Sequence, residues 1–205
     1  MKNTNRIIVY LLLAAAIVSC TATKIDTTWK EPNKAVSIDA LNKVLVVAFF
    51  KTITESHKAE DEMAKYLNHK GIVSYSYLND SISTSNEKVI REKIKADGFD
   101  GAVTMRLIDV DKERVYTPGN IQTYPVYLSN FSGYYHRSFA YYQQPGYYAT
   151  TKTYTVETNV FSIKEDKIIW TALTKTTNPN GVKKMSAEIS EVVYRQMIKE
   201  GFLTK

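Results

Sequence analysis

Cysteine is almost absent from this 205-residue sequence, in which Cys20 is the single one. One cysteine excludes an intramolecular disulfide bond. Histidine is nearly as scarce, with only His57, His69 and His136. None of the three lies in an HExxH-type arrangement, and His57 beside Glu60 and Asp61 is more typical of a charged, solvated helix face. The sequence therefore predicts no metal site.

The motifs of common enzyme classes are missing as well. No glycine-rich loop follows the apolar run at 43–50, so the usual phosphate-binding turn is excluded. There is no Gly-x-Ser-x-Gly sequence for a nucleophilic serine. Asp109 and Asp111 follow a predicted strand, where open α/β sheets bind ligands, but acids in such a charged stretch are typical of a solvated strand end. We predict no catalytic residues and no cofactor.

Long runs of one charge are also lacking. The formal net charge is +6, yet no block of five or more basic residues occurs. This pattern indicates a mildly basic surface rather than a polycationic patch. Nucleic acid is therefore not an expected partner.

The amino-terminal stretch, in contrast, carries a clear signal. Lys2 and Arg6 precede a short apolar segment that is too short to span a membrane, which is typical of a secretory signal peptide over residues 1–19. The sequence IVSC, ending at Cys20, resembles a bacterial lipobox. That resemblance implies cleavage just before Cys20 and a diacylglyceryl group, with acyl chains such as palmitate, on its thiol. Two acyl chains suffice for stable anchoring, where one would not.

The lipobox also carries an expectation about location. We expect an exported protein that is anchored by lipid to the cell envelope. Thr21, rather than Asp, follows the cysteine. In sequences that this one resembles, that position implies transport to the outer membrane, with the body of the protein in the periplasm or outside.

Downstream, residues 20–42 are polar and are predicted to form a tether between the lipid and a single domain over residues 43–205. Apolar runs and helical periodicity then alternate: strands at 43–50, 72–78 and 101–110 are separated by helices at 54–70 and 84–96. This β-α-β-α-β order predicts parallel strands joined by right-handed crossovers. The run at 43–50 is apolar throughout, which predicts a strand buried on both faces.

The second half predicts an antiparallel hairpin from about residue 152 to 176, with a turn at 164–166, and a helix at 182–200 that ends at Gly201. The predicted fold class is therefore α/β with a mixed sheet, or α+β. Between the two halves, residues 111–150 show no clear period and form an insert.

The insert holds nine of the fifteen tyrosines. Tyrosine combines a large apolar face with a hydroxyl group, which suits protein interfaces and sugar stacking. The candidate binding residues are Tyr134, Tyr135, His136, Tyr141, Tyr142, Tyr147 and Tyr148. Two alternatives stay open: the rings fold back over the hairpin as a lid, or they contact a membrane.

Several passages together resemble one group of proteins: Cys20, KVLVVAFF, AVTMRLIDV, KIIWTAL and the closing KEGFL. The chain is similar to bacterial envelope lipoproteins whose domains resemble the amino-terminal domain of TolB and the curli-secretion and penicillin-binding-protein-activator lipoproteins. The resemblance implies binding to envelope proteins and no catalytic residues. We expect a non-catalytic protein that binds a protein or glycan. The alternatives are a subunit that oligomerises through its sheet edge or hairpin, and an enzyme acting on cell wall or glycan.

Overall fold

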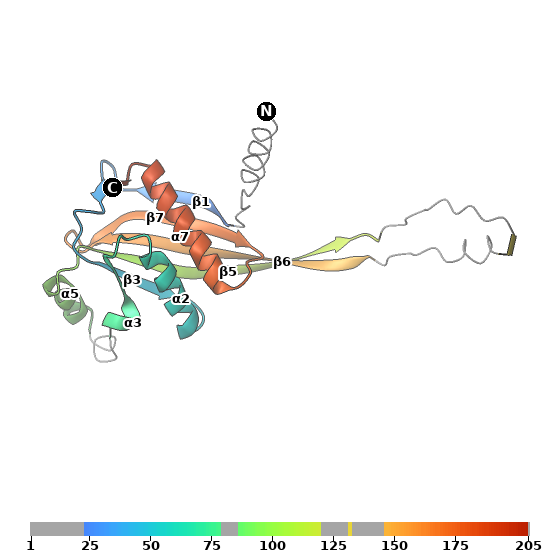
Figure 1. Ribbon diagram of the computed structural model, residues 1–205, viewed down its shortest axis with the longest axis horizontal. Helices are drawn as coiled ribbons and strands as arrows, with labels where there is room; N and C mark the ends of the chain where they lie inside the picture. Colours follow the sequence, from blue (N-terminus) through green and yellow to red (C-terminus); the bar gives the residue numbers. More distant parts are fainter. Residues whose placement is uncertain (1–22, 79–85, 120–130, 133–145, 205) are drawn as a thin grey trace, which may run out of the picture. The chain divides into compact units, whose positions relative to one another are not determined.

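The computed structural model describes residues 23–78, 86–119, 131–132 and 146–204 (Figure 1). It contains a six-stranded mixed sheet in the order β1-β7-β6-β5-β3-β4 and a two-stranded sheet of β2 and β8. The elements in chain order are β1 (Thr23–Lys30), β2 (Val36–Ser37), β3 (Val44–Phe49), α2 (Ile53–Ala64), β4 (Gly71–Val73), α3 (Ser74–Tyr77), α5 (Glu87–Ala96), β5 (Gly101–Thr117), β6 (Tyr147–Ser162), β7 (Lys167–Thr177), α7 (Val182–Lys199) and β8 (Leu203–Thr204). The predicted fold class is confirmed.

The chain divides into two compact units. Unit 1 comprises Met1–Asp109 and Tyr154–Lys205, and unit 2 comprises Val110–Thr153. Strands β5 and β6 each contribute residues to both units. Within the described part of the chain, no helix is both long enough and apolar enough to cross a membrane.

The parallel half of the sheet has the predicted arrangement. Strand β3 pairs in parallel with both β4 and β5, and Val44 lies opposite Gly71 on one side and Gly101 on the other. Val46 is buried in one hydrophobic cluster, whereas Leu45 is buried in a second cluster. Because successive side chains of a strand point to opposite faces, β3 is buried on both faces, as predicted.

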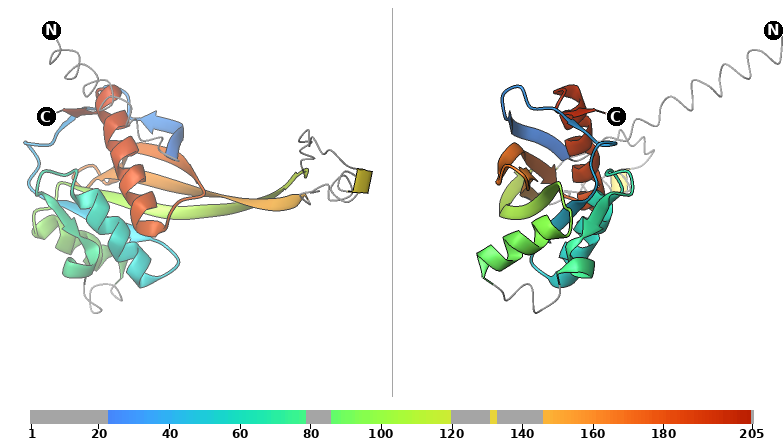
Figure 2. Two further views of the ribbon diagram at one scale, coloured as in Figure 1. Left: turned by 45° about the vertical axis from the view of Figure 1, so that its right-hand side comes forward. Right: turned by 90° about the vertical axis from the view of Figure 1, so that its left-hand side faces the viewer.

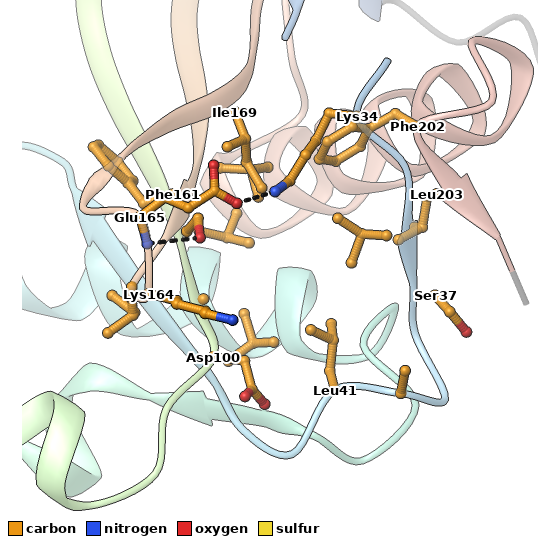
Figure 3. A pocket seen from close by; sticks show the side chains of 18 of the residues that line it. Lys34, Ser37, Leu41, Asp100, Phe161, Lys164, Glu165, Ile169, Phe202 and Leu203 are labelled. Carbon is orange, nitrogen blue, oxygen red and sulfur yellow. Dashed lines mark hydrogen bonds and ion pairs between the residues drawn. The ribbon is translucent and has the colours of Figure 1, made fainter. Parts of the chain in front are cut away.

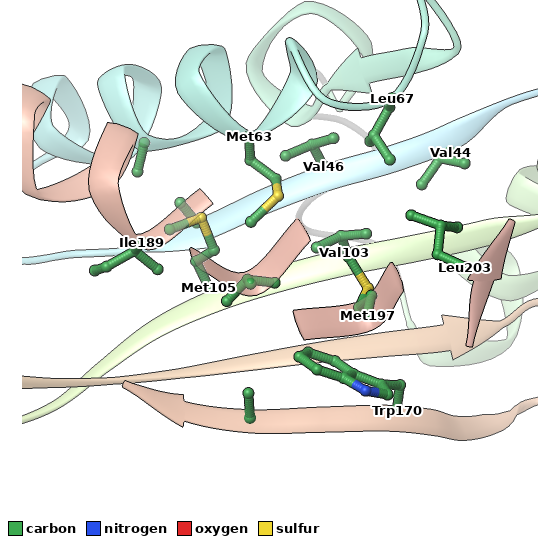
Figure 4. Close-up of a cluster of buried hydrophobic side chains, with 14 of the residues drawn as sticks. Val44, Val46, Met63, Leu67, Val103, Met105, Trp170, Ile189, Met197 and Leu203 are labelled. Carbon is green, nitrogen blue, oxygen red and sulfur yellow. The ribbon is translucent and has the colours of Figure 1, made fainter. Parts of the chain in front are cut away.

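The larger cluster forms where α2 and α7 lie side by side against one face of the sheet (Figures 1 and 2). Met63 of α2 and Ile189 of α7 meet Met105 and Trp170 of the sheet, and each is almost completely inaccessible to water (Figure 4). Burial of one such side chain stabilises the fold by about 1.5–3 kcal/mol. The smaller cluster joins Ile94 and Phe99, around the end of α5, to Leu45.

Helix α7 ends where the sequence predicts. Gly201 has a φ of 63°, a left-handed conformation that suits glycine. The amide of Gly201 donates to the carbonyl of Ile198, and that of Phe202 donates to Met197, which is the Schellman pattern. Phe202 is then buried in the core.

The other two helix predictions need correction at their ends. Helix α2 ends at Ala64 rather than near residue 70, and Gly71 begins β4 instead of ending the helix. A Cβ on Gly71 would lie 3.1 Å from the Cα of Ala64, so the close helix–strand approach explains the glycine. Helix α5 is capped by the side chain of Asn86, which accepts from the amide of Val89. The predicted cap residue, Thr84, lies outside the described residues.

The strand predicted at 72–78 is wrong beyond Val73. The amide of Ser74 donates to Glu60 Oε2 at 2.8 Å, and its hydroxyl donates to Glu60 Oε1 at 2.7 Å. Because the carboxylate of α2 takes this amide, the strand stops and the short helix α3 follows.

Residues 23–37 are not the predicted tether. Strand β1 pairs antiparallel with β7, with Thr23 opposite Thr176, and β2 pairs in parallel with β8. The hydroxyls of Thr23 and Thr176 lie 2.8 Å apart in a buried hydrogen bond. The expected absence of regular structure in 111–150 is also wrong at both ends, because β5 extends to Thr117 and β6 begins at Tyr147.

Candidate functional site

Three tyrosines of unit 2 lie on facing strands of a hairpin. Tyr116 belongs to β5, and Tyr147 and Tyr148 belong to β6. Their exposed fractions are 53%, 64% and 71%. The ring centroids of Tyr116 and Tyr148 are 5.1 Å apart at an interplanar angle of 53°, which is a tilted aromatic pair. The two rings support each other while most of their surface stays in water.

Gly146 explains part of this geometry. A Cβ at this position would lie 2.1 Å from the hydroxyl oxygen of Tyr116, so the Tyr116 ring covers the glycine directly. A side chain at residue 146 would displace the ring. The sequence marks Tyr147 and Tyr148 as candidates, whereas their partner Tyr116 became evident only from the pairing of β5 with β6.

The remaining candidates of the tyrosine cluster lie outside the described residues: Tyr134, Tyr135, His136, Tyr141 and Tyr142. Cys20 lies outside them too. The described tyrosines of the cluster therefore lie at the end of β5 and the start of β6.

A pocket of about 670 Å³ lies within unit 1, at the end of the sheet where β3 and β5 begin (Figure 3). We call it the end pocket. The first wall is the end of the sheet together with the β6–β7 turn. The second wall is the segment of residues 34–41, which carries β2. The third wall is the end of α7 together with β8, which places Phe202 and Leu203 in the lining.

Polar contacts hold the walls of the end pocket in place. Lys34 forms an ion pair with Glu165 across the mouth (Figure 3). The hydrogen bond from Lys34, and next that from Lys167, hold the pKa of the Glu165 carboxyl below its ordinary value. Asp100 accepts hydrogen bonds from the amides of Asn42 and Lys43. The pocket is therefore fixed by contacts between segments distant in the sequence.

The histidine and acid candidates do not converge into a reactive group in the described structure. The His57 ring lies against Tyr75, with centroids 4.1 Å apart. Tyr75 donates to Asp61 Oδ1 at 2.7 Å, and this hydrogen bond raises the tyrosine pKa. The buried Glu60 carboxylate accepts hydrogen bonds from the amide of Ala48 in β3 and from the hydroxyl of Ser74 in α3. Among the described residues, no three histidine, cysteine or acidic side chains form a group that could hold a metal ion.

The acids after the third predicted strand are solvated. Asp109 and Asp111 are both exposed, because β5 continues past them rather than ending there. They therefore do not stand at the carboxyl end of a strand, where the sequence placed them.

Comparison with solved structures finds proteins that are similar over most of this chain at low sequence identity. The PelC dodecamer from Paraburkholderia phytofirmans is similar over 82% of this chain and 94% of its own, with a TM-score of 0.44 and 12% identity. Lipoprotein GNA1162 from Neisseria meningitidis is similar over 77% of this chain and 98% of its own, with a TM-score of 0.38 and 9% identity. No family model and no curated protein matches the sequence.

Proposed function

We propose that this chain is a lipid-anchored, non-catalytic protein of the bacterial cell envelope that binds a partner through the tyrosines of unit 2. The observation that carries the proposal is the tilted Tyr116–Tyr148 pair beside Tyr147, with all three rings more than half exposed. Exposed rings held in a fixed arrangement lose little conformational entropy on binding, which favours recognition.

The lipid anchor belongs to the proposal through Cys20. Strand β1 begins at Thr23, so only residues 21 and 22 separate the proposed lipidated cysteine from the sheet. A fully extended chain spans about 3.5 Å per residue, which limits the distance between Cys20 and Thr23 to roughly 10 Å. Unit 1 would accordingly lie near the lipid surface, rather than at the end of a long tether.

The partner is an envelope protein or a glycan. Tyrosine faces stack on sugar rings and on apolar protein side chains, while the hydroxyls donate and accept hydrogen bonds. Tyr147 and Tyr148 are adjacent in β6, so their side chains point to opposite faces of the strand. A partner that wraps the hairpin would contact both, whereas one that covers a single face would contact only one.

The alternative, a subunit that oligomerises through its sheet edge, has less support. The edge strands are β1 and β4. Strand β4 has three residues, and β1 carries a register shift between Ile25 and Thr27. Short and irregular edges disfavour pairing with another chain. The resemblance to TolB-type domains and the alternative of a cell-wall enzyme stay predictions.

Site-specific photo-crosslinking tests the partner surface. A benzophenone amino acid replaces Tyr148 in the full-length, lipidated protein, and intact cells are irradiated. We expect a discrete adduct at position 148 and none at position 75, because the native tyrosine there is also exposed but lies in unit 1. Adding Tyr116→Ser or Tyr147→Ser should each weaken the adduct about 5- to 30-fold, since each lost aromatic anchor costs about 1–2 kcal/mol.

Two results would contradict the proposal. One is equal crosslinking at positions 148 and 75, which would indicate non-specific contact. The other is an adduct at position 148 that keeps its full intensity after both serine substitutions. Protease and glycosidase digestion of the adduct would distinguish a protein partner from a glycan.

A further inference from the structure

We infer that the end pocket binds a single aliphatic chain with an anionic head, such as a fatty acid. The inference rests on unit 1 alone and does not depend on the tyrosines or on Cys20. Its basis is the combination of an apolar interior, two lysines at the mouth that pair with no acid among the described residues, and walls held by contacts within the chain.

The interior of the end pocket is apolar. Its buried lining comes from the core of unit 1 and combines aliphatic side chains with Phe99 and Phe202: Val44, Val103, Ile169, Met197 and Leu203 are the aliphatic members. The volume of about 670 Å³ lies within the range of about 300–1,000 Å³ for small-molecule sites. Such a lining suits a hydrocarbon chain, whereas a sugar or nucleotide would leave polar groups without partners.

Two polar side chains of the walls, Ser162 and Asp100, already have hydrogen-bond partners within the chain. The hydroxyl of Ser162 accepts from the amide of Glu165 at 3.2 Å. The Asp100 carboxylate is occupied by the amides of Asn42 and Lys43, which fixes the end of the 34–41 segment. These groups shape the pocket instead of facing a ligand.

The mouth of the pocket attracts an anion. Lys34 is neutralised by Glu165, but Lys95 and Lys164 also line the pocket and pair with no carboxylate in the described part of the chain. Figure 3 shows the Lys164 side chain extended between the β6–β7 turn and the 34–41 segment. The two lysine ammonium groups suit the carboxylate of a fatty acid, and the apolar interior suits its hydrocarbon chain.

The walls of the end pocket are held by contacts within the chain. The 34–41 segment is held by the pairing of β2 with β8 and by Lys70, which donates to the carbonyls of Asp39 and Leu41. Because little of the protein has to be ordered on binding, most of the free energy gained by burying the ligand's hydrocarbon chain contributes to affinity.

The test measures affinity against chain length by calorimetry, below micelle-forming concentrations. The full chain carries Cys20→Ser, so that no acyl chain of its own can occupy the pocket. Carboxylates of 8 to 14 carbons should bind about fourfold more tightly for each added methylene until the pocket is full, because each buried methylene contributes about 0.8 kcal/mol. An alkyl phosphate series distinguishes a free fatty acid from a phospholipid-derived anion.

Matched variants locate the ligand. We expect the acid to bind about tenfold more tightly than the alcohol of equal length, and Lys95→Gln with Lys164→Gln to abolish that difference. Lys88→Gln is the control, because Lys88 lies on the same helix, outside the pocket, with an 84% exposed side chain. Ala40→Trp should block binding; Ala40 is an exposed lining residue, so the fold tolerates the ring.

Three results would overturn the inference. The first is an affinity that does not change with chain length. The second is an equal affinity for acid and alcohol in the unsubstituted pocket. The third is undiminished binding by the Ala40→Trp variant, with an unchanged melting temperature, which would place the ligand elsewhere.

Discussion

Glu200, at the end of α7, joins that helix to β1 and β7. Its carboxylate accepts hydrogen bonds from Thr28 of β1 at 2.6 Å, from the buried indole of Trp170 at 2.7 Å and from Gln196 at 2.7 Å. Its carbonyl accepts from Lys30. Burial alone would raise the pKa of Glu200, but these hydrogen bonds and the charge of Lys30 together lower it.

The lowered pKa gives a pH-dependent stability. A carboxyl whose folded pKa lies below its unfolded value stabilises the fold above the unfolded pKa, and that contribution is lost as the pH falls through the folded pKa. We expect Glu200→Ala to lower the free energy of unfolding by about 1–3 kcal/mol at pH 7, because the Trp170 N–H loses its acceptor. The difference from the unsubstituted protein should shrink below about pH 4.

Urea denaturation at pH 7 and at pH 3.5 measures both effects. Glu191→Ala is the control, since Glu191 forms a surface ion pair with Arg195 on the same helix, worth about 0–1 kcal/mol. A destabilisation by Glu200→Ala that is equal at both pH values would show that the carboxylate charge has no part in it.

At the scale of elements, β1 is the part that the sequence did not reveal. Its sequence is polar because Thr23 and Thr28 donate hydrogen bonds to Glu188 and Glu200, while Thr27 is exposed. Its partner β7 lies far away in the sequence, so no local sequence pattern predicts the pairing. Helices α2, α5 and α7, in contrast, follow from local periodicity, and β3 follows from an unbroken apolar run, which is why their positions were predictable.

Adjacent residues of β1 provide a direct check. Ile25 packs against the core cluster, whereas Lys24 is exposed on the other face. We expect Ile25→Ala to lower the free energy of unfolding by about 1–2 kcal/mol, less than a fully buried isoleucine, and Lys24→Ala to change it by less than about 0.5 kcal/mol. Thermal or urea denaturation of both variants distinguishes a strand from a tether, because a tether would give no effect in either case.

Among the helix ends, Gly201 and Phe202 were predictable because a glycine and an apolar residue at the end of a periodic run have one common structural meaning. The end of α2 was not predictable. Asn68 and His69 adopt left-handed conformations, with φ values of 47° and 63°. Neither residue type predicts such a conformation as strongly as glycine does.

At the scale of the whole molecule, the two candidate sites differ in what the sequence reveals. The tyrosine cluster can be recognised from the amino-acid composition of the insert. Tyr147 and Tyr148 are exposed, as a binding surface requires. The end pocket was not visible, because its lining comes from several segments between Lys34 and Leu203 that only the fold brings together.

The proposed lipid anchor would determine where both sites act. Fractionation of cells that produce the full chain, followed by mass measurement of the mature amino terminus, is the most direct measurement. We expect the protein in the membrane fraction, released only by detergent, beginning at Cys20 and heavier than the polypeptide by a diacylglyceryl group. Cys20→Ala should release the protein or leave it unprocessed. A mature terminus of unmodified mass, with both proteins fractionating alike, would contradict the proposed lipid anchor.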